Sequence, residues 1–230
     1  MIDYGQFCTV ARGAEVLCDR WTPLVVRELL CGSTQFNEIR RGVPRMSPAL
    51  LSTRLRTLEE FGIVVRRSTG HRTSYELTPA GEELRPIVMA MGEWGARWIG
   101  TRLRPDQLDA GFLMWDVRRF VRLDEFPDRR VVVHFHFPDA ATRERHWWLV
   151  VDDGVSDLCR DDPGYDLTLE VRSSVRALTE VWTGDARAEE AVSSGDILVV
   201  GPARDAERLW TWLGTSAFAP TRAEVLGRPS

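Results

Sequence analysis

The stretch between residues 47 and 78 constrains the fold most. It opens with SPALLSTRLRTLEEFG, in which leucines recur at the spacing of one helix face. Ser47 is a good N-cap, a proline suits the first turn, and Gly62 ends the helix. Two strand-like segments follow, Ile63–Arg67 and Thr73–Leu77, joined by the tip Ser-Thr-Gly-His. The pattern predicts a helix followed by a short β-hairpin.

The chemistry of this helix and hairpin points to duplex DNA. The helix face opposite the leucines carries small or basic side chains, which suit entry into a major groove. A basic hairpin can lie along the backbone or in a minor groove. The alternative is an ordinary α+β protein in which these arginines are solvated surface. The residues expected to contact DNA are Arg45, Ser47, Pro48, Ala49, Ser52, Thr53, Arg56, Arg66, Arg67, His71 and Arg72.

The distribution of charge supports DNA binding by one half of the chain. Residues 40–72 hold eight arginines against two acids, although the whole chain has a net charge of −4. Residues 1–104 have a balance of +4 and residues 105–230 a balance of −8. Because phosphate contacts need only a local basic surface, we expect a DNA-binding and dimerisation domain at 1–104 and a second domain with a different partner at 105–230.

Several classes of protein lack support. No apolar run is long enough for a membrane span and the start lacks the basic-then-apolar form of a signal peptide, so we expect a cytoplasmic protein with no membrane contact. The four cysteines form no C-x-x-C pair, and Cys18 and Cys31 fit as small core side chains. Nucleophile, phosphate-loop and dinucleotide motifs are missing, so we expect neither an enzyme nor a cofactor.

Further helices are predicted around the Ser47 helix. Segments 8–18, 22–32 and 35–42 are helix-like, and the last of these forms a helix-turn-helix with the Ser47 helix. Another helix starts at Pro79, and Pro86 should kink or break it. The apolar side chains on one face of this helix form either a dimer face, since operators are commonly palindromic and bound by dimers, or a stripe that packs within its own chain. The stripe residues are Leu84, Ile87, Val88, Met91, Trp94 and Trp98.

The second half predicts an α+β domain with an antiparallel sheet and helices on one side. Residues 130–137 alternate apolar and polar, and Asp-Asp-Gly at 152–154 predicts a hairpin. His134, His136 and His146 fit the polar face of a strand better than a metal site, so no metal is expected. Aromatic residues either line an apolar pocket or fill the core. The candidate ligand-binding residues are Phe112, Trp115, Phe135, Trp147, Trp182 and Trp210.

Residues 8–100 closely resemble the HxlR family of bacterial winged helix-turn-helix transcriptional regulators. The matching motifs are a cysteine at position 8, DRWTPLVVRELLCG, FNEIR, SPALLSTRLRTLEEFGIVVR and YELTPAGEEL. The resemblance implies a dimeric winged helix with recognition helix Ser47–Phe61 and wing Val65–Tyr75. It also implies a redox role for Cys8, which matches a cysteine that senses oxidants or electrophiles in several members. The alternative is that Cys8 only packs.

Residues from about 108 to 216 look like the SCP2 sterol-carrier fold. The matching segments are YDLTLEVRSSVRALTEVWTG and the glycine-containing phrase from Ala191 to Gly201, followed by a closing helix. This resemblance implies an apolar tunnel between a sheet and its helices, and therefore a domain that binds hydrophobic molecules. The alternative is that the domain only stabilises the dimer.

The sequence as a whole predicts a homodimeric DNA-binding transcriptional regulator of α+β fold. We expect a repressor that binds a palindromic double-stranded operator and whose second domain senses a hydrophobic small molecule. One alternative is a thiol-switch regulator in which Cys8 responds to oxidants or electrophiles and the second domain is structural. Another is an enzyme or lipid carrier whose first half serves only for assembly.

Overall fold

The protein divides into two compact units, Met1–Gly92 and Glu93–Ser230. The computed structural model describes residues 3–70, 72–99 and 103–227. Each unit has its own buried apolar core, as expected of independently packed domains. The division lies before the predicted one between residues 104 and 105.

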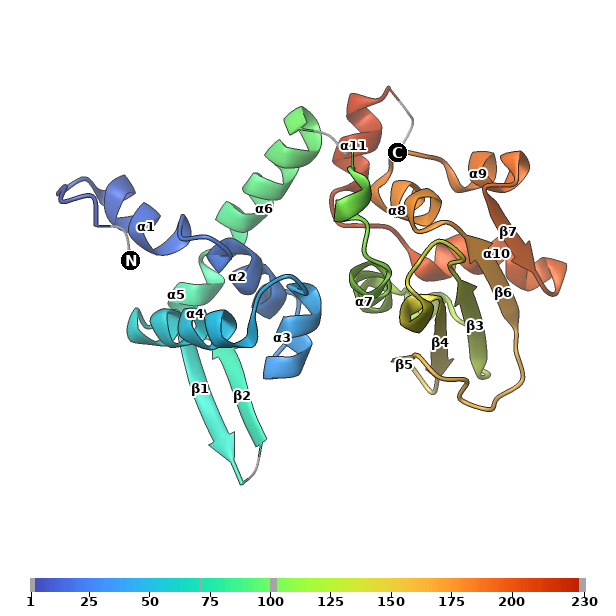
Figure 1. Cartoon of the computed structure of the whole chain (residues 1–230), viewed down its shortest axis with the longest axis horizontal. Helices are drawn as coiled ribbons and strands as arrows, with labels where there is room; N and C mark the ends of the chain where they lie inside the picture. The colour runs from blue at the N-terminus through green and yellow to red at the C-terminus, as the bar shows by residue number, and fades with distance from the viewer. Residues whose placement is uncertain (1–2, 71, 100–102, 228–230) are drawn as a thin grey trace. The chain divides into compact units, whose positions relative to one another are not determined.

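The first unit is a set of helices followed by a two-stranded hairpin (Figure 1). Its core brings together one face each of the second, third and fourth helices, with Val25, Ile39, Leu51 and Leu55 almost fully buried. The elements are α1 (Thr9–Leu17), α2 (Thr22–Leu30), α3 (Phe36–Gly42), α4 (Pro48–Glu60), β1 (Val64–Thr69), β2 (Arg72–Leu77), α5 (Pro79–Glu82) and α6 (Arg85–Trp94).

Local sequence explains where these elements begin and end. Gln35 and Glu38 form a reciprocal capping box at the start of α3. The predicted break at Pro86 is confirmed, since α5 ends at Glu82 and α6 starts one residue before the proline. Proline has no N–H to donate and its ring crowds the carbonyl four residues back, so a continuous helix is disfavoured there.

The helix α6 leaves much of the predicted stripe exposed. Ile87, Met91 and Trp94 are about half exposed, whereas Val88 is buried in the core of the first unit. Trp98, the last residue of the predicted stripe, lies in a π-helical turn, Gly95–Ile99, and is exposed as well. Packing within this chain therefore covers only part of the apolar face.

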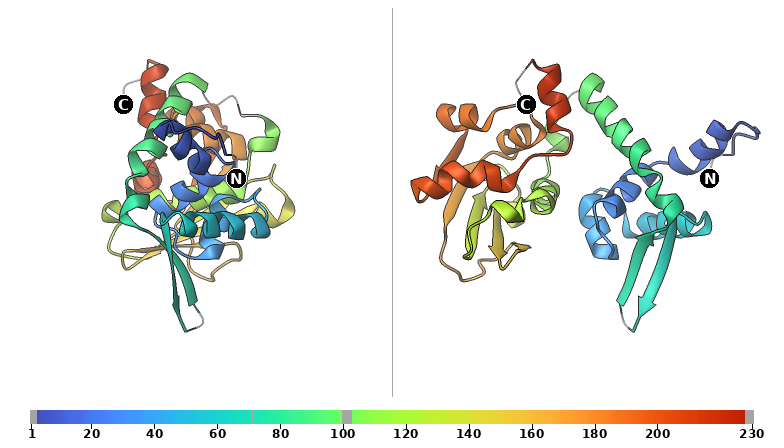
Figure 2. Two further views of the ribbon diagram at one scale, coloured as in Figure 1. Left: turned by 90° about the vertical axis from the view of Figure 1, so that its left-hand side faces the viewer. Right: turned by 180° about the vertical axis from the view of Figure 1, so that it is seen from behind.

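The second unit is a five-stranded sheet with helices on one face. In Figure 1, α10 passes behind the sheet, and in Figure 2, seen from behind, it lies in front of it. Its main elements are α7 (Ala110–Phe120), β3 (Val131–His136), β4 (His146–Asp152), β5 (Val155–Cys159), β6 (Leu169–Ser173), α8 (Val175–Thr183), α9 (Ala188–Ser194), β7 (Ile197–Val200), α10 (Ala203–Leu213) and α11 (Ala219–Val225). Single 3₁₀ turns lie at Pro105–Gln107, Leu123–Glu125 and Thr142–Glu144.

The strand order is β5-β4-β3-β6-β7, and one pairing corrects the predicted antiparallel sheet. Strands β3 and β6 run parallel, with Val133 opposite Leu169, while the other three pairings are antiparallel. The chain reaches β6 only after the β4–β5 hairpin and a long loop, and this crossover permits a parallel pair. The hairpin predicted at residues 152–154 is confirmed, and its turn residues Asp153 and Gly154 both have positive φ.

The helix-facing side of the sheet forms the core of the second unit. Val133, Phe135 and Leu149 are fully buried against helices, whereas His134 and His136 lie on the opposite face. The alternation predicted for β3 is therefore confirmed.

Cys18 is exposed and Cys31 only partly buried, so the prediction of two core cysteines is wrong for Cys18. Cys18 lies past the end of α1, where the chain turns toward α2.

Candidate nucleic-acid interface

The helix α4 presents a polar face to solvent while its apolar stripe is buried. Ser47 caps it, accepting a hydrogen bond from the Leu50 N–H at 3.3 Å, and Pro48 occupies its first turn. Leu51, Leu55 and Leu58 are at most 1% exposed. The predicted base-reading residues are all exposed: Ser47, Pro48, Ala49, Ser52, Thr53 and Arg56.

Two of these residues differ in how free their side chains are. The Thr53 hydroxyl donates to the Ala49 carbonyl at 3.0 Å, so it must rotate before it can contact a base. Arg56 has no hydrogen bond or ion pair within the described part of the chain, so its guanidinium is available to a partner. Arg45 is exposed in the turn between α3 and α4.

Arg54 plays a different part from its neighbour Arg56. Its guanidinium pairs with Asp19 at 2.6 Å and donates to the Arg20 carbonyl at 3.2 Å. The pair joins α4 to the segment before α2 and is mostly shielded from solvent, which favours a well-defined geometry. The sequence pattern indicated Arg54 only as part of the local positive charge. Asp19, the acid that opens the DRWTP motif, was the one sequence feature that could have suggested an ion pair with it.

The β1–β2 hairpin projects away from the helices of its unit, as both views in Figure 2 show. Its base is fixed by the Tyr75 N–H, which donates to the Thr34 carbonyl at 2.7 Å, and by the Thr78 hydroxyl on the Gly62 carbonyl at 2.6 Å. The hairpin therefore has the form of a wing beside α4.

The wing arginines are not equivalent. Arg67 donates to Glu76 at 2.6 Å across the two strands, so part of its charge is already neutralised. Arg66 and Arg72 are exposed and have no ion pair among the residues that the structure describes. His71, the remaining predicted DNA contact, lies outside the described residues.

The predicted redox residue, Cys8, lies at the start of α1. It is the exposed N-cap of that helix, and its side chain makes no capping hydrogen bond. Arg12, one turn further along α1, is ion-paired with Glu15 at 3.7 Å. The thiol is therefore accessible, and the helix N-terminus is its nearest source of positive potential.

The predicted ligand-binding residues lie in and around the core of the second unit. Phe135, Trp147 and Trp182 are buried in it and Trp210 packs against it, whereas Trp115 is buried and Phe112 is partly buried outside this core. Trp182 donates its indole N–H to the buried carboxylate of Asp116 at 3.0 Å. These aromatic side chains pack closely with aliphatic neighbours, and their role toward a ligand stays a prediction.

The three predicted histidines gather on the open face of the sheet. His134 Nε2 lies 3.0 Å from His146 Nδ1, and the His136 and His146 rings stack 4.7 Å apart. Burial lowers the pKa of His134, and the nearby His146 lowers it further. Within residues 3–70, 72–99 and 103–227, no three His, Cys, Asp or Glu side chains are arranged to hold a metal ion.

The fold and the interface define the class of protein. A helix-turn-helix with an exposed polar recognition face and an adjoining basic wing is a DNA-binding module of transcriptional regulators. No helix in the described part of the chain is long and apolar enough to cross a membrane.

Comparison with known proteins gives the family. The HxlR-like helix-turn-helix family model matches residues 16–102. The HTH-type transcriptional regulator YvaP of Bacillus subtilis is 38% identical over 91 residues, which are 38% of this chain and 84% of YvaP. The regulator sll1512 of Synechocystis is 33% identical over 98 residues, 41% of this chain and 73% of that protein. The chain belongs to the HxlR family of transcriptional regulators.

Among the solved structures similar to this chain is the reduced form of the transcriptional regulator YodB from B. subtilis, with 29% sequence identity. The match covers 40% of this chain and 95% of YodB, with a TM-score of 0.36.

Proposed function

We propose that this regulator binds a palindromic operator as a homodimer, with α4 of each subunit in a major groove and the β1–β2 wing on the adjacent backbone or minor groove. The observation that carries the proposal is the division of α4 into a buried leucine stripe and an exposed face of small and basic side chains. Arg56 reads a base, and Arg66 and Arg72 contact phosphates.

The homodimer is supported by the uncovered stripe on α6. Ile87, Met91 and Trp94 are apolar and about half exposed, which is unfavourable in water unless another surface covers them. A second copy of the helix supplies such a surface and also sets the spacing of two recognition helices on a palindrome.

The test of the DNA-binding proposal selects operator sequences from random duplexes with the full-length protein and then measures affinity at fixed salt. Arg56→Ala weakens operator binding by about 1–3 kcal/mol because a base contact is lost. Arg187→Ala, an exposed arginine at the start of α9, is the matched control and leaves affinity unchanged. Equal affinities of Arg56→Ala and the wild type would show that α4 faces DNA with another side.

The second unit, in this proposal, is an SCP2-like sensor for a hydrophobic small molecule, and the regulator is a repressor. The aromatic and aliphatic side chains between the sheet and its helices support it, since ligand sites are lined predominantly by such side chains. The ligand acts only if it binds one state of the dimer better than the other. Native mass spectrometry of the full-length protein tests this. An additional mass that travels with the folded protein and leaves on denaturation is expected.

A second candidate function is a thiol switch at Cys8. It is favoured by the exposed thiol at the N-terminus of α1. In that case the operator affinity of the wild type changes on treatment with diamide or a quinone, and Cys8→Ser abolishes the response. A response that persists in Cys8→Ser excludes Cys8 as the sensor.

A further inference from the structure

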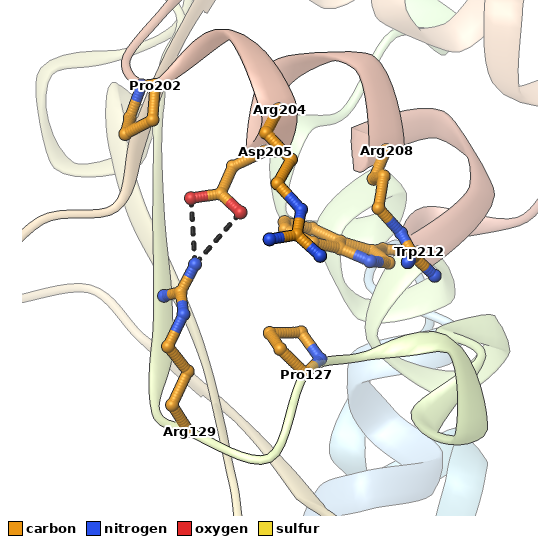
Figure 3. A pocket seen from close by; sticks show the side chains of 7 residues that line it. All are labelled: Pro127, Arg129, Pro202, Arg204, Asp205, Arg208 and Trp212. Atoms are coloured by element: carbon orange, nitrogen blue, oxygen red, sulfur yellow. Dashed lines mark hydrogen bonds and ion pairs between the residues drawn. The ribbon is translucent and has the colours of Figure 1, made fainter.

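A small cavity of about 230 Å³ lies in the second unit beside the first turns of α10, and it is separate from the core aromatic residues considered above. Figure 3 shows its walls. Arg204 and Arg208 extend from α10, Arg129 approaches from the segment before β3, and Pro127 lies below them. Pro202 and Trp212 complete the lining.

The cavity carries an excess of positive charge. Its lining holds three arginines and a single acid, Asp205, which accepts two hydrogen bonds from Arg129 at 2.8 and 2.9 Å. Arg208 donates through one nitrogen to the carboxylate of Glu125 at 3.1 Å. After the Arg129–Asp205 and Arg208–Glu125 pairs are set aside, Arg204 is the one arginine of the lining without an acidic partner among the described residues.

Arg204 is the side chain whose charge is uncompensated. It is exposed and forms no ion pair or hydrogen bond with any residue that the structure describes. In Figure 3 its guanidinium reaches into the space above Pro127, next to that of Arg208. A planar guanidinium with free N–H groups matches the two oxygens of a carboxylate.

The floor of the cavity is apolar but contains one unsatisfied donor. Trp212 is 1% exposed and stacks on Phe126, with ring centroids 5.1 Å apart. Its indole Nε1–H is buried and has no hydrogen-bond partner among the described residues. Buried donors are nearly always paired in folded proteins, with protein groups or ordered water, so this N–H is able to donate to an acceptor that enters the cavity.

The backbone at this place also favours an anion. The helix α10 starts here with Pro202 as N-cap, and no side chain caps it. The N–H groups of Ala203 and Arg204, at the start of this eleven-residue helix, carry partial positive charge, whereas those of Asp205 and Ala206 already donate to the Pro202 carbonyl at 3.0 Å. Together with Arg204 and the Trp212 N–H, this gives an oxygen acceptor several donors of different origin.

We propose that this cavity, the Arg204 pocket, binds a small organic monocarboxylate with a flat apolar body. The carboxylate pairs with Arg204, and the apolar body lies against Pro127 and Trp212. The volume is below the range of about 300–1,000 Å³ that drug-sized ligands occupy, so the ligand is on the scale of a single aromatic ring. The inference rests on the proposed function only in treating the second unit as a ligand-binding unit.

The test is calorimetric titration of the full-length protein with benzoate and with benzamide, its uncharged counterpart. Benzoate binds at least tenfold more tightly than benzamide, and its affinity falls as ionic strength rises. Arg204→Ala lowers benzoate affinity at least tenfold, whereas Arg187→Ala leaves it unchanged. Arg204→Lys, which keeps the charge but loses the planar fork, gives an intermediate affinity.

A second readout reports on the floor of the pocket. The Trp212 indole N–H resonance, assigned with Trp212→Phe, shifts on addition of benzoate and not on addition of benzamide. Three results overturn the proposal: equal binding of benzoate and benzamide, benzoate binding unaffected by Arg204→Ala, or sulfate binding as tight as benzoate. The last would mean that the apolar floor contributes nothing.

The experiments distinguish failure of the proposed Arg204 pocket from failure of the proposed regulation of DNA binding. If benzoate binds through Arg204 but operator affinity does not change, the pocket stands and the ligand does not regulate DNA binding. If a hydrophobic molecule alters operator affinity equally in the wild type and in Arg204→Ala, the regulatory proposal stands and the Arg204 pocket is not its site.

Discussion

The carboxyl group of Glu28 in α2 occupies the space where a side chain on Gly42 in α3 would lie. A Cβ built on Gly42 would overlap the Glu28 carboxyl carbon and both of its oxygens. Glu28 is fully buried and is held by Arg27 at 3.3 Å and by the Ser33 hydroxyl at 3.5 Å. The glycine therefore lets the end of α3 pack directly against a buried, hydrogen-bonded acid of α2.

Gly42→Ala should destabilise the first unit. A methyl group at this position either displaces the buried carboxylate or pushes α3 away, and overpacking of this kind costs about 1–3 kcal/mol. Urea unfolding of the full-length protein measures the loss. Gly13→Ala in α1 is the matched control, because a Cβ there meets nothing within 4 Å, and it leaves stability equal or slightly higher. A neutral Gly42→Ala would show that Glu28 can move at no cost.

Substitutions in the wing should separate free from paired arginines. Arg72→Ala removes an unpaired cation and lowers the dependence of log affinity on log salt by roughly one contact. Arg67→Ala has a smaller effect, because Glu76 already neutralises part of the Arg67 charge. Operator affinity measured over a series of salt concentrations checks both variants. A larger change for Arg67 than for Arg72 would argue that the Arg67–Glu76 pair breaks on DNA.

Arg54→Ala should weaken DNA binding indirectly, through stability. The variant loses the pair with Asp19, and because the pair is largely shielded, it leaves Asp19 without its cation. We expect a loss of about 1–3 kcal/mol in the free energy of unfolding, in the range for hydrogen bonds to charged groups. A double-mutant cycle with Asp19→Ala checks the coupling. If the two single losses simply add, the side chains contribute independently and the contact is not stabilising.

Asp116→Ala should destabilise the second unit. The Asp116 carboxylate accepts the indole N–H of Trp182, and both side chains are buried. Its removal leaves a buried donor unsatisfied, which costs about 1–3 kcal/mol. Thermal unfolding of the full-length protein provides the measurement. Trp182→Phe combined with Asp116→Ala should recover part of the loss, and no recovery would contradict the assigned pairing.

The stability of the second unit should fall on acidification in a manner that depends on His134. Burial, and then the adjacent His146 and His136, lower the pKa of His134, while Glu170 and Asp162 oppose the shift. A lowered pKa means that the unfolded chain binds the proton more readily than the folded one. The stability from neutral His134 is therefore complete above its usual pKa of about 6.5 and is lost as the pH falls toward the lowered folded value.

His134→Gln tests this dependence. The variant should show a shallower decline in the free energy of unfolding between about pH 6.5 and 5, the interval below the usual histidine pKa. Denaturant unfolding at several pH values gives the slope. Wild-type and variant curves that run parallel throughout would remove His134 from the pH response.

Local patterns in the sequence determined most elements of the first unit. The serine cap and the leucine spacing located α4, and Pro86 located the break between α5 and α6, because caps, periodicity and proline geometry act within a few residues. The alternation along β3 likewise placed its histidines on one face. The sequence did not indicate α11, whose segment carries few periodic apolar residues.

Contacts between segments that are distant in the sequence could be established from the tertiary structure alone. The parallel pairing of β3 with β6 depends on a crossover that no local pattern records. Arg54 and Arg56 differ because Arg54 is paired with Asp19, a residue 35 positions away in the sequence, whereas Arg56 has no such partner among the described residues. The Arg204 pocket joins residues near 127–129 with α10, which are far apart in the chain. Hydrophobic spacing and caps specify elements, whereas ion pairs, registers and cavities arise from packing energies between elements, which sequence neighbours do not encode.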